Sequence, residues 1–204
     1  MSIQAVIFDV GGVLLRVQDR RARRKWEAHL GLAEGTLFKA IVTSQVSARA
    51  MVGEVSEEAV WKHAAASFKL NAEQSRAFQR DFWSGNRLNA ELVRFMRALR
   101  RRFKVAILSN AWSDTREEFS QRFGLDRLAD AMIISAEEGV AKPDPRIYHI
   151  AVERLGVRAE AAVFVDDLPE NVQGAQAVGM RGVQFKNNAQ TIAEIKRHLE
   201  DSVL

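Results

Sequence analysis

From about residue 85 onward, short apolar runs alternate with longer stretches in which apolar residues recur at helical spacing. The apolar runs cover 104–109, 131–135, 162–166 and 182–185. The helical stretches cover 90–101, 113–124, 145–155, 170–178 and a last segment after 185. Apolar runs of this length are typical of buried strands, and three of the helical stretches stop at a glycine. Strands that alternate with helices predict βαβ units and a parallel sheet covered on both faces.

The first part of the chain follows a different pattern. Ala5–Asp9 is a short apolar run that ends in an acid, and Gly11 and Gly12 then interrupt any regular element. Between about 18 and 84, apolar residues recur at helical spacing, which indicates about four helices and no strand. We therefore predict an α/β fold: a Rossmann-like parallel sheet core formed by 1–17 and 85–204, with an α-helical cap at 18–84 inserted after the first strand.

Particular residues support this interpretation of the inserted segment. Ser56 followed by Glu57 and Glu58 is typical of a helix start, with an N-cap and acids in the first turn. The tryptophans of the segment are expected to form its core and its packing against the main domain; they are Trp26, Trp61 and Trp83.

Composition narrows the class of protein. The chain has 204 residues, 47% of them hydrophobic and 27% charged, which is ordinary for a soluble globular protein. No apolar run approaches the length of a membrane span, and the N-terminus lacks the basic segment of a secretory signal. The chain has no cysteine, which excludes disulfides and thiolate catalysis and fits a cytoplasmic location. Its four histidines lie far apart in sequence, which argues against a zinc hydrolase.

The charge is modestly positive, with a net value of +4. Basic residues concentrate in 16–25 and 97–104. The simplest interpretation is that these are solvated helix faces, and the functional alternative is a field that attracts anionic small molecules. Nucleic acid is not an expected partner, because neither run carries interleaved aromatic residues.

Polar residues follow the predicted strands. Asp9 ends the first strand, Ser109 and Asn110 end the strand at 104–109, and Asp166 and Asp167 end the strand at 162–166. Lys142 lies in the loop after 131–135. Because ligands bind at the carboxyl ends of the strands in open parallel sheets, we expect these side chains to meet at one edge.

The chemistry of this set suits a phosphate monoester. A carboxylate such as Asp9 can attack phosphorus and divide one difficult step into two. Two adjacent acids, Asp166 and Asp167, are costly unless a cation lies beside them. Magnesium prefers oxygen ligands, and Asp9, the Gly11 carbonyl and one or both of the acid pair would suffice.

Other groups would complete the site. Ser109 and Asn110 offer hydrogen-bond donors toward phosphate oxygens, and the ammonium of Lys142 would neutralise charge. Asn171 lies about one helical turn beyond the acid pair and could orient a ligand. Trp112 is expected at the mouth of the site. Taken singly, each of these residues has a plain structural alternative as a helix cap, a turn residue or a solvated lysine.

Four segments in this order resemble the haloacid dehalogenase superfamily of hydrolases: IFDVGGVL around Asp9, ILSNA around Ser109, AKPDPRIY around Lys142, and VFVDDLPENV around the acid pair. The segments FDVGGVL and KPDPRIY are similar to those of the branch that contains sugar-phosphate phosphatases and the phosphatase domain of epoxide hydrolases. The resemblance implies a phosphoaspartyl intermediate on Asp9, and magnesium bound by Asp9, the Gly11 carbonyl, Asp166 and Asp167. It also implies phosphate contacts from Ser109 and Lys142, and a substrate pocket shaped by the cap.

One position departs from the family pattern. The family places a second aspartate two residues after the nucleophile, where it protonates the leaving oxygen, and this chain has Gly11 there. The loss of a general acid of this kind lowers rates by about 10²–10⁴-fold. The enzyme would then be slow, would use substrates with good leaving groups such as a sugar 1-phosphate or acyl phosphate, or would rely on another residue.

These observations predict a magnesium-dependent phosphatase that hydrolyses a small phosphorylated metabolite, such as a sugar phosphate. Two alternatives stay open because of Gly11. The first is a 2-haloacid dehalogenase, which also lacks the second aspartate but needs no metal; the intact pair of Asp166 and Asp167 favours phosphate. The second is a catalytically weak member that binds a phosphorylated ligand. A receiver-type signalling domain fits poorly, because there the acidic pair precedes the acceptor aspartate along the chain.

Overall fold

The computed structural model describes residues 2–200, and its centre is a parallel sheet. Across these residues the sheet has five strands in the order β5-β4-β1-β6-β7. The strands are β1 (Ala5–Phe8), β4 (Lys104–Ser109), β5 (Ala131–Ile134), β6 (Ala162–Asp166) and β7 (Arg181–Gln184). Every neighbouring pair is parallel. The predicted fold class, an α/β protein with a parallel sheet core, is confirmed.

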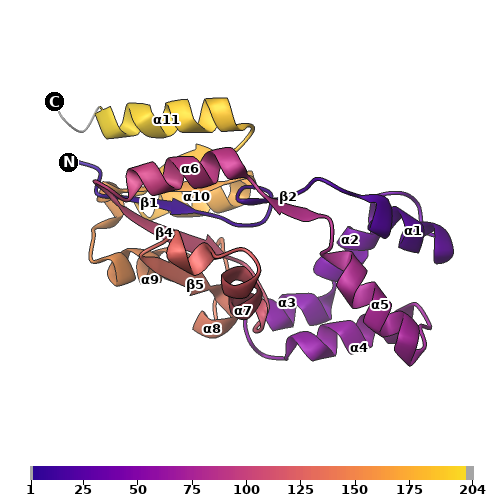
Figure 1. Cartoon of the computed structure of the whole chain (residues 1–204). Coiled ribbons are helices and arrows are strands. Elements are labelled where there is room, and N and C mark those ends of the chain that lie inside the picture. The colour runs from indigo at the N-terminus through magenta and orange to yellow at the C-terminus, as the bar shows by residue number, and fades with distance from the viewer. Residues whose placement is uncertain (1, 201–204) are drawn as a thin grey trace.

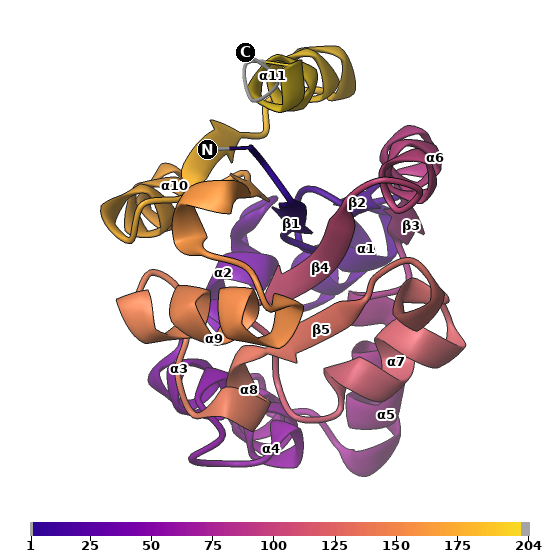
Figure 2. The same ribbon diagram turned by 90° about the vertical axis from the view of Figure 1, so that its left-hand side faces the viewer.

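Helices cover both faces of the sheet because the strand residues alternate between two apolar clusters. Val6 and Phe8 point to the face covered by α6 (Ala90–Leu99), α7 (Thr115–Gln121) and α11 (Asn188–Glu200). Ala5 and Ile7 point to the face covered by α9 (Pro145–Leu155) and α10 (Pro169–Ala177). Figure 2 shows these two layers on either side of the sheet. Both faces of the central strand are thus removed from water, as its unbroken apolar sequence requires.

The segment between the first two strands of the sheet forms a separate group of helices, which we call the helical module. Within the described residues it comprises α1 (Arg21–His29), α2 (Thr36–Val42), α3 (Gln45–Met51), α4 (Glu57–Ser67) and α5 (Ala72–Phe82). Its helices pack around their own apolar cluster, which includes Leu37, Val60, Trp61, Phe78 and Phe82. In Figure 1 the module occupies the end of the molecule away from the sheet and the chain termini.

The expectation of about four helices was low by one. The chain breaks between α2 and α3 at Thr43 and Ser44, where the Ser44 hydroxyl accepts a hydrogen bond from the Ser47 backbone and caps α3. The expected helix start after Ser56 is present, since α4 begins at Glu57 with acids in its first turn. The Ser56 side chain itself makes no capping hydrogen bond.

Two short strands connect the sheet to the helical module. Strand β2 (Leu15–Val17) pairs antiparallel with β3 (Asn86–Leu88), so the chain enters and leaves the module through one narrow ribbon. The remaining short elements are α8 (Ser135–Glu138) and the 3-10 turns η1 (Leu125–Arg127) and η2 (Ala159–Ala161). The sequence pattern did not predict the ribbon.

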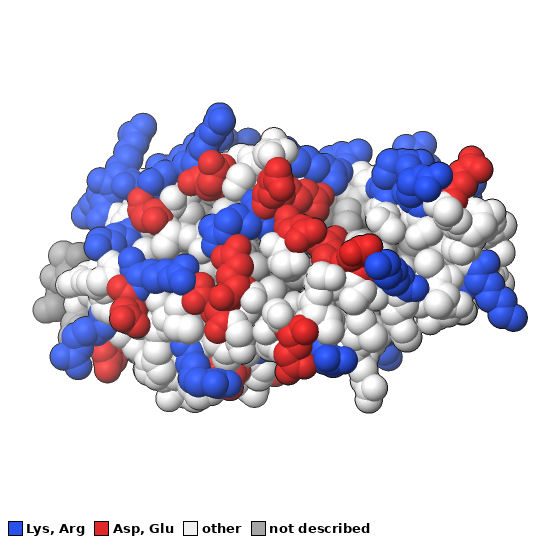
Figure 3. Space-filling model, turned by 90° about the horizontal axis from the view of Figure 1, so that it is seen from below, with Lys and Arg blue, Asp and Glu red and all other residues white. Residues whose placement is uncertain are grey.

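Two observations concern the length of the helices and the distribution of charge on one face of the molecule. No helix among residues 2–200 is both long enough and apolar enough to span a bilayer. On the face seen in Figure 3, basic and acidic side chains are interspersed rather than gathered into one basic surface.

Candidate active site

The carboxyl end of the sheet brings four separate loops together. Phe8 aligns with Ile107 on one neighbouring strand and with Val165 on the other. The residues that follow these positions therefore lie at one level, and the Asp9 and Asp166 carboxylates become neighbours. The expected convergence of strand-end side chains is thus present in the geometry.

Lys142 occupies the centre of this group. Its ammonium nitrogen donates to Oδ1 of Asp9 at 2.6 Å and to Oδ2 of Asp166 at 2.6 Å. Its third donor goes to the Leu108 carbonyl at 3.0 Å. The whole residue is 5% exposed. An ammonium this deeply buried needs such partners, since desolvation of an unpaired charge is very costly.

Asn110 holds the backbone that carries Lys142. Its amide nitrogen donates to the Lys142 carbonyl at 2.9 Å, and its amide oxygen accepts from the Lys142 backbone N–H at 2.8 Å. The sequence suggested that Asn110 contacts phosphate. In the structure both ends of its amide bond to the Lys142 backbone, and the expected phosphate contact stays a prediction.

The two acids of the pair differ in their surroundings. Asp166 is fully buried and accepts hydrogen bonds from Lys142, from the Leu168 backbone and from the Asn171 amide. Asp167 is only half-buried, and its carboxylate accepts no side-chain hydrogen bond from a described residue. The expected orienting role of Asn171 therefore falls on Asp166, while Asp167 keeps its oxygens available.

The site carries more negative than positive charge. Asp9, Asp166 and Asp167 offer carboxylate oxygens that all lie within 4.8 Å of one another, and Lys142 supplies a single compensating charge. Burial raises the pKa of Asp9 to about 7, with the Lys142 ammonium opposing and the Asp166 carboxylate adding to this shift. Burial and Asp166 also raise the pKa of Asp167. The two carboxylates raise the pKa of Lys142 against the effect of burial.

This charge imbalance fits a divalent cation. Oxygen ligands from three clustered carboxylates are what magnesium prefers, and its charge would offset their repulsion. The Gly11 carbonyl, which accepts no hydrogen bond from a described residue, lines the same cavity. Asp9, Asp167 and Gly11 are thus the residues best able to hold magnesium, with Asp166 beside them.

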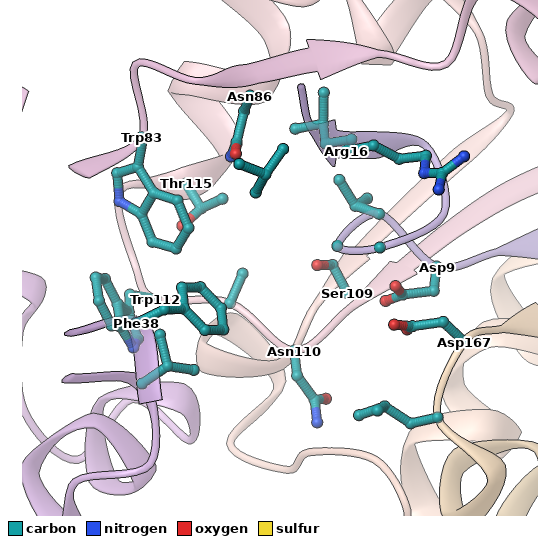
Figure 4. A pocket seen from close by; sticks show the side chains of 18 of the residues that line it. Asp9, Arg16, Phe38, Trp83, Asn86, Ser109, Asn110, Trp112, Thr115 and Asp167 are labelled. Atoms are coloured by element: carbon teal, nitrogen blue, oxygen red, sulfur yellow. The ribbon is translucent and has the colours of Figure 1, made fainter. Parts of the chain in front are cut away.

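Ser109 lies at the end of β4 with its hydroxyl toward the cavity. Figure 4 shows it beside the carboxylates of Asp9 and Asp167, which point toward one another. The residue is 3% exposed, and its hydroxyl makes no hydrogen bond to another described residue. Because no described buried side-chain oxygen lacks a partner, this hydroxyl is accessible from the cavity and available to an oxygen of a ligand.

The two glycines after Asp9 have different environments. A Cβ atom at Gly11 would meet nothing within 4 Å, so a side chain fits there. A Cβ atom at Gly12 would lie 2.3 Å from the Asp167 carboxylate, and its φ of +81° favours glycine. Gly12 is therefore required by the turn, whereas a Cβ atom at the exposed Gly11 would meet open space.

A cavity of about 750 Å³ extends from the carboxylates to the helical module. Phe38, Trp83 and Trp112 lie on its side opposite Asp9 and Asp167, as Figure 4 shows. Arginines of β2 and the start of α1 also line it, namely Arg16, Arg20, Arg23 and Arg24. The sequence analysis left this basic run either as a solvated face or as a field that attracts anionic small molecules, and it did not place individual arginines in the site.

The tryptophans of the helical module have mainly structural positions. Trp61 is buried in the module cluster, and Trp26 and Trp83 pack against it. Trp112, from the loop after β4, also enters this cluster and donates to the Ser47 hydroxyl at 3.1 Å. Trp112 lines the cavity as expected for a residue near the mouth, but it also joins the core to the module.

Comparisons with known proteins agree with this geometry. A family model described as haloacid dehalogenase-like hydrolase matches residues 3–179. The chain is 36% identical to "Phosphatase MT3486" of Mycobacterium tuberculosis over 103 residues, which are 50% of this chain and 48% of that protein. It is 26% identical to "Sesquiterpene phosphatase astK" of Aspergillus oryzae over 200 residues, which are 96% of each chain.

Solved structures with low sequence identity share the fold of this chain. A haloacid dehalogenase family enzyme from Bacteroides thetaiotaomicron, solved with magnesium and inorganic phosphate, superposes with a TM-score of 0.75. It is 18% identical and covers 91% of this chain and 95% of its own. Three of the curated relatives are longer proteins, of which the chain spans only 19%, 48% and 39%.

Proposed function

Because the chain belongs to the haloacid dehalogenase-like hydrolase family, we infer that it is a magnesium-dependent phosphatase acting on a small phosphorylated metabolite. The observation that carries this proposal is the meeting of Asp9 with Lys142 and the pair of Asp166 and Asp167. A nucleophile, an ammonium and a cation site at one point are what the transfer of a phosphoryl group requires.

Asp9 is the proposed nucleophile. Its Oδ1 atom is held by Lys142, and its Oδ2 atom accepts no hydrogen bond from a described residue. Attack of Oδ2 on phosphorus forms a phosphoaspartyl bond while the ester P–O bond breaks, and the leaving oxygen departs as an anion that takes its proton from water. Water then attacks the phosphorus of this intermediate, which releases inorganic phosphate and restores the carboxylate.

The surrounding groups would bind the phosphate. Ser109 donates its free hydroxyl to a phosphate oxygen, and the Lys142 charge stabilises the extra negative charge of the transition state. Asn110 acts through Lys142 as a positioning residue. Magnesium, when bound by Asp9, the Gly11 carbonyl and Asp167, supplies further neutralisation of the phosphate oxygens.

The glycine at position 11 restricts the substrates to those with a stable leaving group. No carboxylate stands where the family pattern has its general acid, so the leaving oxygen must be stable with little help. A sugar 1-phosphate or an acyl phosphate meets this condition better than a simple alkyl phosphate. Relatives named as phosphatases, including the sesquiterpene phosphatase that matches along the whole chain, support phosphate as the substrate group. The cytoplasmic location stays a prediction, based on the lack of cysteine.

The test is hydrolysis of p-nitrophenyl phosphate, a substrate with a good leaving group, with magnesium and again with chelator. We expect turnover that needs magnesium and that falls by at least about 10³-fold in Asp9→Asn. Equal product release by wild type and Asp9→Asn would overturn the proposal.

The same preparation tests the alternatives. Chelator-resistant release of halide from a 2-haloacid would establish a dehalogenase instead. Binding of phosphosugars without any turnover would establish a ligand-binding member of the family.

A further inference from the structure

The helical-module side of the cavity carries arginines that the proposed hydrolysis does not use. The acids Glu27, Glu34 and Glu57 line the same side, and Glu57 accepts a hydrogen bond from Trp61. Arg20 and Arg23 both line the cavity, one at the start of α1 and one in its first turn. The scissile phosphate would lie at the opposite end, beside Asp9 and Ser109. A second recognition element is therefore built into the same cavity.

Arg23 is held firmly by aromatic rings. Its guanidinium carbon lies 4.8 Å from the ring centre of Phe38 and 4.9 Å from that of Phe82. Its Nε donates to the Phe82 carbonyl at 2.8 Å. These contacts fix the plane of the guanidinium and leave its two terminal nitrogens without a hydrogen-bond partner among residues 2–200. Because no described buried side-chain nitrogen lacks a partner, these nitrogens face open space.

The neighbouring acids do not neutralise this charge by direct contact. Glu34 pairs with Arg24. Glu27 lies close enough to favour the charged form of Arg23, yet its Oε1 atom accepts from the Gly35 and Leu37 backbones, and no ion pair joins it to Arg23. Burial lowers the pKa of Arg23, and the like charge of Arg20 lowers it further. Two guanidinium groups that repel one another in a cavity favour an anion between them.

We propose that Arg20 and Arg23 form an anion subsite that receives a second anionic group of the substrate, remote from the phosphate that is hydrolysed. This inference rests on the proposed function and narrows its substrate class. The substrate is a phosphate monoester whose carbon body carries a carboxylate or a second phosphate at its far end. The body lies along Phe38, Trp83 and Trp112, and Arg23, a planar fork of fixed orientation, suits a carboxylate or phosphate.

The experiment compares ligands that differ only in the far group. Straight-chain alkyl phosphonates of increasing length, each with and without a terminal carboxylate, are titrated calorimetrically into wild type and variants in the presence of magnesium. We expect the carboxylate to tighten binding by about 10- to 100-fold at the chain length that spans the cavity. In Arg23→Gln this gain disappears, while the affinity for the plain alkyl phosphonate stays within about twofold.

Matched variants separate recognition from folding. Arg21→Gln makes the same change of charge on the same helix, but Arg21 is highly exposed, pairs with Asp19 and lies outside the cavity; it should keep the full gain. Arg20→Gln removes an exposed side chain that makes no hydrogen bond or ion pair with a described residue, so it should reduce the gain in affinity without lowering the melting temperature.

Two outcomes would overturn the subsite. In the first, the terminal carboxylate does not raise the affinity of wild type for the phosphonate at any chain length. In the second, Arg23→Gln lowers the affinity for both phosphonates of a pair equally, as the loss of a purely structural arginine would. The phosphatase proposal fails separately, through absence of p-nitrophenyl phosphate turnover, and the calorimetric comparison still decides the subsite in that case.

Discussion

Asn110 and Lys142, which are 32 positions apart in sequence, exchange two hydrogen bonds and thereby fix the ammonium beside Asp9. Asn110→Ala should lower kcat by about 10- to 100-fold with little change in KM, because a small displacement of Lys142 weakens transition-state stabilisation more than substrate binding. Steady-state kinetics with p-nitrophenyl phosphate measure this. Asn187→Ala, which removes an exposed asparagine, is the control, and an equal loss there would contradict the positioning role.

Removal of the Lys142 charge should destabilise the fold. Lys142→Met leaves the buried carboxylates of Asp9 and Asp166 without their ammonium, and the free energy of unfolding should fall by about 3–5 kcal/mol. Urea denaturation followed by circular dichroism measures the change. Lys104→Met is the matched control: Lys104 donates to the Leu155 carbonyl at the other end of the same sheet, and its loss should cost roughly 1 kcal/mol. Similar losses in the two variants would argue against a buried charge network.

Replacement of Gly11 by aspartate, the residue that the family pattern has at this position, should be tolerated. A Cβ atom there meets nothing within 4 Å, so Gly11→Asp should fold normally and speed the hydrolysis of alkyl phosphates, whose leaving groups need a proton, by up to about 10²–10⁴-fold. The gain should be much smaller for p-nitrophenyl phosphate. Gly12→Asp is the contrasting variant, since its side chain would collide with Asp167; it should lose both stability and activity. An unchanged rate for Gly11→Asp on every substrate would show that another group already supplies the proton.

Asp166 and Asp167 should respond differently to the same substitution. Asp167→Asn, at a half-buried carboxylate that accepts no hydrogen bond from another described side chain, should weaken magnesium binding while the metal-free protein keeps its melting temperature. Asp166→Asn, at the partner of Lys142 and Asn171, should lower the melting temperature of the metal-free protein. Magnesium titration by calorimetry and thermal unfolding with chelator separate the two effects. If Asp166→Asn kept the wild-type melting temperature and Asp167→Asn lowered it, Asp167 rather than Asp166 would be the structural carboxylate.

The sheet was predictable because its strands are short, apolar on both faces and separated by helices. The unbroken run at 162–166 is buried at every position of β6, as a central parallel strand must be. The meeting of Asp9 and Asp166 also followed from a general property of parallel sheets, whose carboxyl ends share one edge. No residue-level contact was needed for either inference.

Other features depend on contacts between residues that the hydrophobic periodicity of the sequence does not reveal. Strands β2 and β3 have three residues each and pair across about 70 positions, so neither shows an alternating pattern. The break between α2 and α3 spans two residues within one helical pattern. Arg23 belongs to a basic run that is typical of a solvated face, and only its packing against the rings of Phe38 and Phe82 distinguishes it.

The position of Trp112 has a consequence for how fast ligands can exchange. Trp112 is 4% exposed, and its indole packs edge-on against Trp61 and donates to Ser47. A side chain of the sheet domain is thus buried in the apolar cluster of the module. A swing of the module away from the sheet would wet most of this ring, which costs about 4–6 kcal/mol. The open form would then make up roughly one molecule in 10³–10⁴. Any movement of the module that exposes the Trp112 ring would therefore carry this free-energy cost before a ligand could enter or leave by that route.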